Sequence, residues 1–239
     1  MGVEGVLRPL ESHLQALITM GSMFPPPESA DEDGVVCVSR DLNCDMLLDA
    51  YWHGIFPWPC AEHCILWSSP KQRGVIPIDE FHIPKSFQRE LKKHLFEIRI
   101  DTCFDEVIEA CAFTERKDEE GTWITASIRR EYKRFHRLGF AHSFEAFDSD
   151  GSLAGGLYGI LLNRIFIGES MFFRKSGASK AAFCHCAEVL AAHGVELIDT
   201  QVVTNMTASF GAYEIPFADY LRRLEALRGD RPEPISLKS

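Results

Sequence analysis

The stretch RIFIGESMFFRKSGASKAAFCHCAEVLAAHGVELIDTQVV, residues 164–203, decides the fold class. It begins with a predicted strand, residues 164–168, which we expect to form a hairpin with residues 153–162 around Asn163. A long helix is predicted over residues 176–193, and Gly194 ends it, because glycine readily adopts the left-handed conformation found after helices. A second strand follows over residues 195–203. This succession of strand, helix and strand predicts a fold that mixes helices with a sheet.

The remaining chain adds elements on both sides of this stretch. Helices are predicted over residues 41–51, 84–95, 102–111, 125–139 and from 216 onward, and strands over 67–78 (short, with turns), 96–100 and 143–147. A change in composition near residues 96–101 divides the chain into a small N-terminal α/β domain, residues 1–95, and a larger mixed α/β domain, residues 96–239. The expected fold class is therefore α+β.

Composition and charge exclude several classes of protein. With 46% hydrophobic and 25% charged residues, the 239-residue chain is ordinary globular protein rather than disordered, collagen-like or coiled coil. The longest apolar run, residues 154–162, is far shorter than the roughly 20 residues of a membrane span, and Glu4 and Glu11 argue against a signal peptide. We therefore expect a cytoplasmic protein. The net charge of −10 disfavours non-specific binding of nucleic acid. A nucleic acid could still bind through a local basic face.

Two cysteine clusters suggest a metal site at first reading. Cys60 and Cys64 flank His63, and Cys184 and Cys186 flank His185. Structural zinc sites usually combine paired Cys-x2–4-Cys modules, and two cysteines two residues apart on a helix point to different faces. We expect no metal and reduced thiols throughout, because a chain of this length needs no disulfides.

Polar residues lie between, beside and within the two predicted strands. Arg174, Gly177 and Ser179 nearly fit the pyrophosphate-binding loop of acetyltransferases, although an ordinary helix start explains them equally well. Asp199 and Gln201 lie two apart in an apolar strand and so share a face; Glu169 has a similar apolar setting. These carboxylates form either a salt-bridged strand end or a pocket for a cationic substrate group.

Two tryptophans lie beside turns rather than in a regular apolar pattern. Trp58 follows a proline-bounded turn, and Trp123 lies in the sequence Gly121–Thr125. Each is either a core residue or a platform on which a nucleotide base stacks.

Eight segments, in order along residues 24–226, resemble the leucyl/phenylalanyl-tRNA–protein transferase family. They are Ala50-Tyr51-x-x-Gly54-Ile55-Phe56-Pro57-Trp58, Gly121-Thr122-Trp123-Ile124-Thr125, Leu138-Gly139-x-Ala141-His142-Ser143, Gly155-Gly156-Leu157-Tyr158-Gly159, Gly168-Glu169-Ser170-Met171-Phe172, Ala178-Ser179-Lys180, Leu197-Ile198-Asp199-x-Gln201-Val202 and Ala208-Ser209-x-Gly211-Ala212-x-Glu214-Ile215-Pro216. The resemblance implies an acetyltransferase-like larger domain that uses neither CoA nor metal. It also implies transfer of Leu, Phe or Met from aminoacyl-tRNA to proteins that begin with Lys or Arg, which marks them for degradation.

The resemblance also implies roles for individual residues. Asp199 and Gln201 match the catalytic pair, with Glu169 beside them; Trp58 and Trp123 match residues that hold the terminal adenosine of the tRNA. The pocket for the carried side chain is matched by Leu157, Met171, Phe183, Cys186 and Ile198. Cys186 stands where the family often has an aromatic residue, Ser39-Arg40-Asp41 replaces Gly-Gly-Asp, and Ser68 replaces a common tryptophan.

From the chemistry of aminoacyl transfer we expect Gln201 to orient the incoming amine through its carbonyl. Asp199 is then expected to fix the glutamine amide and to offset the developing ammonium charge. Candidate contacts to tRNA phosphates are Lys85, Arg89, Lys92, Arg130 and Arg134, which otherwise are solvated surface charges. The expected partners are the 3′ end of aminoacyl-tRNA and basic N-termini, with the enzyme a monomer. The rival functions are a CoA-dependent acyltransferase and a non-catalytic reader of basic N-termini.

Overall fold

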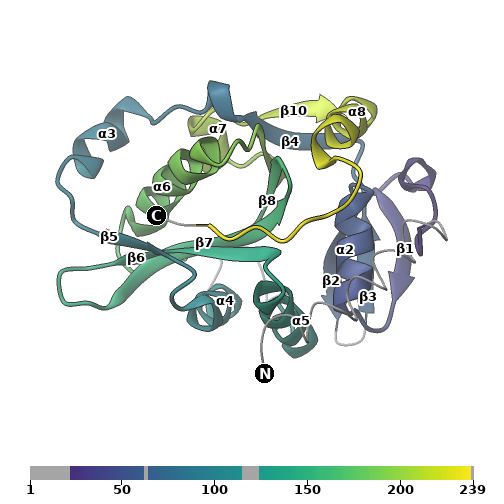
Figure 1. The fold of residues 1–239 in the computed structure, drawn as a ribbon, viewed down its shortest axis with the longest axis horizontal. Helices are drawn as coiled ribbons and strands as arrows, with labels where there is room; N and C mark the ends of the chain where they lie inside the picture. Colours follow the sequence, from purple (N-terminus) through teal and green to yellow (C-terminus); the bar gives the residue numbers. More distant parts are fainter. Residues whose placement is uncertain (1–21, 62–63, 115–123, 238–239) are drawn as a thin grey trace.

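The computed structural model describes residues 22–61, 64–114 and 124–237, and two sheets organise this part of the chain (Figure 1). The smaller sheet is antiparallel, with strand order β1-β3-β2. Its strands are β1 (Val35–Ser39), β2 (Phe56–Ala61) and β3 (Cys64–Ser68). Helix α2 (Cys44–Trp52), N-capped by the Asn43 side chain, packs on this sheet through buried residues such as Leu47 and Leu48.

The larger sheet has seven strands in the order β10-β4-β9-β8-β7-β6-β5. The strands are β4 (Gln72–Pro77), β5 (Glu97–Ile100), β6 (Ala141–Phe147), β7 (Leu153–Leu162), β8 (Ile165–Phe173), β9 (Leu197–Gln201) and β10 (Tyr213–Pro216). Neighbouring strands are antiparallel except β8 and β9, which are parallel and joined by helix α6 (Ala178–Ala192). The predicted succession of strand, helix and strand is therefore confirmed.

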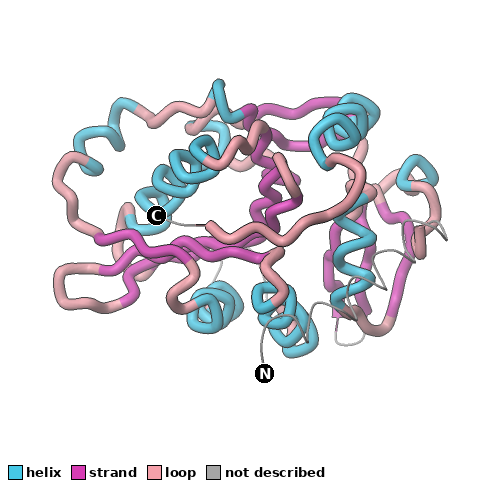
Figure 2. Tube along the Cα trace, in the orientation of Figure 1, coloured by secondary structure: helices cyan, strands magenta, loops and turns pink. Residues whose placement is uncertain are grey.

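Helices cover both faces of the larger sheet (Figures 1 and 2). Helix α6 lies on one face, while α4 (Phe104–Phe113) and α5 (Ala126–Arg137) lie on the other. Every residue of β6 and β7 is consequently buried, as expected for strands covered on both sides. We call the two apolar layers the α6 core and the α4–α5 core; the second continues into the smaller sheet. Three further helices are α3 (Lys85–Leu91), α7 (Asn205–Ser209) and α8 (Phe217–Arg228).

The predicted α+β class is confirmed, with a small N-terminal sheet and a larger mixed sheet. Strand β4 lies within the predicted N-terminal domain, residues 1–95, yet it is hydrogen-bonded between β9 and β10 in the larger sheet. The division of the chain at residue 95 stays a prediction.

The expectation that all cysteines are reduced is wrong for one pair. Cys60 and Cys64 are joined by a disulfide. Residues 61 and 64 face each other where β2 turns into β3, which brings the two cysteine Cα atoms to 5.6 Å, a normal separation for a disulfide. The other six cysteines are free thiols.

Candidate active site

The site lies where the parallel strands β8 and β9 separate. Their pairing runs from Ile165 opposite Leu197 to Ile167 opposite Asp199, where the paired stretch ends. Glu169 follows on one strand and Gln201 on the other. The Gln201 side-chain Nε2 donates a hydrogen bond of 2.9 Å to Glu169 Oε1 across the opening. The fold thus brings together the residues that the sequence places 32 positions apart.

A β-bulge in β8 sets the direction of Glu169. In the pairing with β7, Tyr158 faces Ser170 while the next residue, Gly159, faces Gly168, so Glu169 is the extra residue. The bulge reverses the alternation of side chains: Ile167 belongs to the α4–α5 core, whereas Met171, four residues later, packs on the α6 core. Bulges of this kind redirect side chains beside functional sites.

Asp199 is fully buried, and both of its carboxylate oxygens are occupied. Oδ1 accepts hydrogen bonds from Arg73 Nε (2.9 Å) and from the Gln201 backbone N–H (2.8 Å). Oδ2 accepts from Arg73 Nη2 (2.6 Å) and from the Tyr220 hydroxyl (2.7 Å). Four donors match the roughly four lone-pair positions of a carboxylate, so Asp199 has no free position toward a substrate.

Gln201 is held by two carboxylates, one at its backbone and one at its side chain. Its φ of 60° is in the left-handed region, which is uncommon outside glycine, and the Asp199 hydrogen bond to its backbone N–H stabilises this conformation. We expected Asp199 to fix the side-chain amide, but the structure gives that contact to Glu169. No described residue donates a hydrogen bond to Gln201 Oε1. This carbonyl oxygen can therefore accept one from an incoming amine.

The surroundings of Glu169 change its acidity. Removal from water raises its pKa to about 7 from 4.5, although tyrosine hydroxyls and the Arg73 charge act in the opposite direction. The Tyr132 hydroxyl donates to Glu169 Oε2 at 3.0 Å, and Tyr51 contacts Tyr132 through its own hydroxyl. Burial raises the pKa of both tyrosines, so they remain protonated donors. A carboxylate with a pKa near neutrality can exchange a proton at physiological pH.

Trp58 lies on β2 at the border between the two sheets. Its residue surface is 41% exposed, so it is not a core tryptophan. Its ring centroid lies 6.5 Å from that of Phe56, and the Phe56 ring lies 4.5 Å from the Arg73 guanidinium carbon. One aromatic ring and one arginine therefore separate Trp58 from Asp199. Trp123, the second predicted adenosine-binding residue, lies outside the described residues.

The five residues matched to the pocket for the carried side chain gather in one layer. Leu157, Met171, Phe183, Cys186 and Ile198 all belong to or pack on the α6 core. Leu157 and Met171 face each other across β7 and β8. The bulge at Glu169 puts Met171 on this side, so the carboxylate and the apolar layer lie on opposite faces of the same strand.

The predicted phosphate contacts fall into two groups with different surroundings. Lys85, Arg89 and Lys92 are exposed on or next to α3, and they form no ion pair within the described residues. We call these three residues the α3 basic patch. On α5, Arg130 pairs with Glu131 at 2.9 Å and Arg134 lies 4.0 Å from the same carboxylate. The α5 charges are thus partly neutralised by the protein itself.

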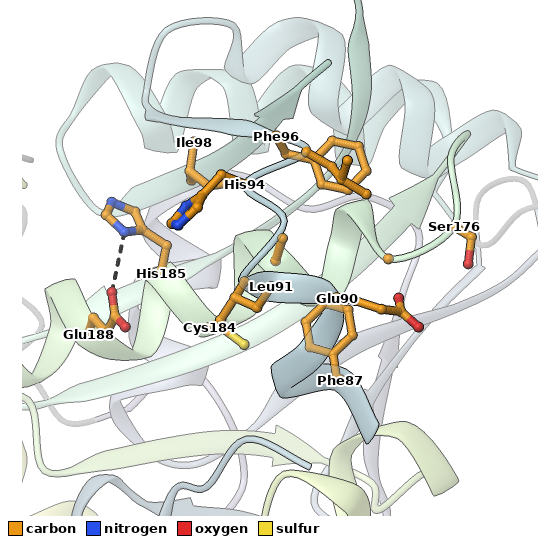
Figure 3. Close-up of a pocket in the computed structure, with 13 residues that line it drawn as sticks. Phe87, Glu90, Leu91, His94, Phe96, Ile98, Ser176, Cys184, His185 and Glu188 are labelled. Carbon is orange, nitrogen blue, oxygen red and sulfur yellow. Dashed lines mark ion pairs between the residues drawn. The ribbon is translucent and has the colours of Figure 1, made fainter. Parts of the chain in front are cut away.

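A cavity of about 230 Å³ lies apart from the predicted site residues, between α3, β5 and the outer side of α6 (Figure 3). Phe87, Leu91 and Cys184 line it, whereas Cys186 does not. His185 forms an ion-pair contact with Glu188 here.

Sequence reasoning missed three residues of the site. Arg73 lies in residues 67–78, for which the sequence predicts only short strands with turns, while Tyr132 and Tyr220 lie in the helices predicted over residues 125–139 and from 216 onward. A hydroxyl at a buried helix position was the one available signal, because a buried tyrosine usually finds a hydrogen-bond partner.

Two kinds of feature are absent from the described residues. These residues contain no group of three or more His, Cys, Asp or Glu side chains that could hold a metal ion. They also contain no helix long and apolar enough to span a bilayer.

Comparison with known proteins places this arrangement in a family. A family model described as leucyl/phenylalanyl-tRNA protein transferase matches residues 75–225, and the model of that family's N-terminal domain matches residues 40–71. Among solved structures, the C-terminal domain of a putative lysylphosphatidylglycerol synthetase from Agrobacterium fabrum matches 78% of this chain and 70% of its own, with a TM-score of 0.40 and 10% identity.

Curated relatives are similar over nearly their whole length. The leucyl/phenylalanyl-tRNA–protein transferase of Anaeromyxobacter dehalogenans (strain 2CP-C) is 48% identical over 84% of this chain and 86% of its own. Those of Saccharophagus degradans (46% identical, 88% and 87% covered) and Dechloromonas aromatica (43% identical, 86% and 88% covered) are similar. The chain therefore belongs to the leucyl/phenylalanyl-tRNA–protein transferase family.

Proposed function

We infer that this aminoacyltransferase moves Leu, Phe or Met from aminoacyl-tRNA to the N-terminal Lys or Arg of acceptor proteins, marking them for degradation. The observation that carries the mechanism is the Gln201–Glu169 hydrogen bond at the opening between β8 and β9. It joins a carbonyl acceptor to a carboxylate with a pKa of about 7, on the strand β8 whose other face borders the α6 core, and near an exposed tryptophan.

The reaction requires a neutral amine, one proton acceptor and no activating nucleotide. The aminoacyl ester is already activated, and the acceptor α-amine has an ordinary pKa of about 7.7–8.0. Gln201 Oε1 accepts a hydrogen bond from the amine and aims its lone pair at the ester carbonyl carbon. As the C–N bond forms, Glu169 takes a proton from the nitrogen. The C–O bond to the ribose then breaks, and this proton passes to the leaving ribose oxygen.

Asp199 has a positioning role in this mechanism. Its four hydrogen-bond donors are all protein groups, and one is the backbone N–H of Gln201. It therefore holds Gln201 in its left-handed conformation. The cationic side chain of the acceptor's first residue is instead attracted by Glu169, which has hydrogen bonds to Tyr132 and Gln201 but no ion pair within the described residues.

Trp58 supports the terminal adenosine in this proposal. Its exposed ring lies on the hairpin next to the site, and stacking of a base on an aromatic ring contributes roughly 1–3 kcal/mol. The carried side chain enters the α6 core between Leu157, Met171 and Ile198. Phe183 and Cys186 border this pocket from α6, and the cysteine leaves more room than an aromatic residue would.

We propose that the α3 basic patch, rather than the charges on α5, meets tRNA phosphates. Its cations form no ion pair within the described residues, whereas Arg130 and Arg134 share Glu131. A cation that already has a carboxylate partner gains less from a phosphate, because the existing pair must be broken. We further propose that the enzyme acts as a monomer in the cytoplasm, the compartment in which charged tRNA is made.

The CoA-dependent alternative has a specific obstacle. A CoA pyrophosphate would need the backbone N–H groups at the start of α6, where Gly177 is the N-cap. Glu90 Oε2 lies 3.3 Å from the position that a Cβ of Gly177 would occupy. A carboxylate at this helix start repels a pyrophosphate, and this favours aminoacyl transfer over CoA chemistry.

The test is transfer of radiolabelled Leu or Phe from charged tRNA to a peptide that begins with Arg. A peptide identical except for an N-terminal Ala is the control. Label on the Arg peptide alone supports the proposal. Binding of Arg peptides without consumption of aminoacyl-tRNA would instead indicate a reader of basic N-termini, and saturable acetyl-CoA binding without label transfer would indicate the acyltransferase.

A further inference from the structure

Arg73 is a buried cation that touches three separate segments of the chain. It is fully buried on β4, and two of its nitrogens donate to the two oxygens of Asp199. Its third nitrogen, Nη1, donates to the backbone carbonyl of Gly54 at 3.3 Å. Its guanidinium carbon lies 4.5 Å from the Phe56 ring centroid and 4.6 Å from the Tyr220 ring centroid, one ring on β2 and the other on α8.

These contacts join the two sheets at the site. Gly54 and Phe56 lead into the strand that carries Trp58, whereas Asp199 is two residues from Gln201. The Arg73 guanidinium therefore contacts both the strand that carries Trp58, the proposed adenosine platform, and the strand that carries Gln201, the proposed amine acceptor. A planar group with fixed donor directions transmits geometry between such segments better than a flexible ammonium does.

We propose that Arg73 is a positioning residue, which fixes the strand that carries Trp58 relative to the strand that carries Gln201 and so sets the ester carbonyl against the acceptor amine. This inference rests on the function proposed above. Arg73 acts through Phe56 on one side and through Asp199 on the other. The guanidinium itself touches neither substrate, because protein groups surround it.

The charge of Arg73 has a second consequence that can be measured separately. The groups that act on Glu169 are Tyr51 on α2, Tyr132 on α5, Asp199 on β9 and Arg73 on β4. The Asp199 charge raises the pKa of Glu169 and the Arg73 charge lowers it. Removal of the Arg73 charge therefore raises the pKa of Glu169. The low-pH side of the pH–activity profile (the acidic limb) then moves to higher pH. A lysine at position 73 keeps the charge and leaves the acidic limb in place.

The experiment compares Arg73→Lys with Arg73→Met, and Arg99→Met is the matched control. Arg99 makes the same kind of two-bond pair with Glu97 and lies over the Phe147 ring, but at the edge strand β5. We expect Arg73→Lys to lower kcat by about 10²-fold, the cost of a displacement of about 1 Å. The acidic limb should stay at its normal pH in Arg73→Lys and move upward in Arg73→Met, while Arg99→Met retains normal values.

A double-mutant cycle with Trp58→Ala distinguishes positioning from general stability. If Arg73 positions Trp58, the loss in kcat/KM for aminoacyl-tRNA caused by Trp58→Ala should be several-fold smaller in the Arg73→Lys background. Independent, multiplying losses would overturn the proposal, as would a normal kcat in Arg73→Lys. The Lys variant keeps a cation beside Asp199 and so tests the idea even if the Met variant does not fold. Failure of the wild-type chain to transfer label would refute the proposed function instead, before Arg73 is tested.

Discussion

Replacement of Glu169 by glutamine should make the protein more stable and much less active at alkaline pH. In the folded protein the pKa of Glu169 is about 7, against an ordinary value of 4.5. A raised carboxyl pKa means that folding favours the protonated form. The stability gained in this way is complete below pH 4.5 and is lost as the pH rises through 7. A glutamine, which is always neutral, avoids that loss.

The size of the effect follows from the pKa difference. Each pKa unit is worth about 1.4 kcal/mol, so the difference between 7 and 4.5 gives an upper limit of about 3 kcal/mol. The variant loses the charge-assisted hydrogen bond from Tyr132, which removes about 1–2 kcal/mol of this gain. We expect Glu169→Gln to raise Tm by roughly 2–8 °C at pH 8.5 and to leave it nearly unchanged at pH 5.

The same substitution should change the pH dependence of transfer. Below pH 7 the wild-type kcat/KM should fall about a hundredfold per pH unit, because Glu169 and the acceptor amine both become protonated. In Glu169→Gln only the amine titrates, so kcat/KM should fall about tenfold per pH unit. The maximal kcat/KM of this variant should be about 10²–10⁴-fold lower than that of the wild type. Thermal unfolding and single-turnover transfer, each between pH 5 and 8.5, are the assays. A Tm difference that does not change with pH, or an unchanged slope of log(kcat/KM), would refute the assignment.

Three further predictions concern the surroundings of this carboxylate. Trp58→Ala should raise KM for aminoacyl-tRNA about 5- to 150-fold, since a stacked base is worth roughly 1–3 kcal/mol; Phe113→Ala, which removes another exposed ring, should not change KM. Gly74→Ala should destabilise the protein by about 1–3 kcal/mol in urea unfolding and lower transfer, because a Cβ would lie 2.7 Å from the Thr200 hydroxyl. Gly168→Ala, in which the Cβ would lie 3.7 Å from the nearest atom, should lower the free energy of unfolding less. Charge reversal of the α3 basic patch should lower the slope of log affinity against log salt by roughly 2 for tRNA, and an unchanged slope would show that the patch is only solvated.

Local sequence signals predicted most elements of the fold. The helix predicted over residues 125–139 is confirmed, and Thr125 caps it, since its side chain accepts from the Ile128 N–H at the start of α5. The predicted turn at Asn163 is confirmed as well, because this residue has a positive φ between the paired strands β7 and β8. Each of these features depends on residues close together in the chain, which is why the amino-acid order alone indicates them.

The parts that local signals could not predict depend on pairing between distant strands. Nothing in residues 164–173 marks Glu169 as an extra residue, because a bulge is defined only by the partner strand β7. Without the bulge, Met171 would share a face with Ile167, and the predicted side-chain pocket would lose one of its members. The resemblance to the family implies roles for both Met171 and Glu169. It does not explain why the two side chains lie on opposite faces of β8.

The burial of Arg73 explains why the site needs both of its other charges. A guanidinium removed from water requires a carboxylate partner, and Asp199 supplies it with two direct hydrogen bonds. Because Asp199 is paired with Arg73, it has no free position for an incoming amine, and the proposed mechanism therefore assigns the proton transfer to a second carboxylate. Glu169 has hydrogen bonds from Tyr132 and Gln201 but no cation in direct contact among the described residues, and removal from water raises its pKa to about 7. In the proposed mechanism the two acids therefore divide their tasks by environment: Asp199, paired with Arg73, fixes geometry, and Glu169 exchanges the proton.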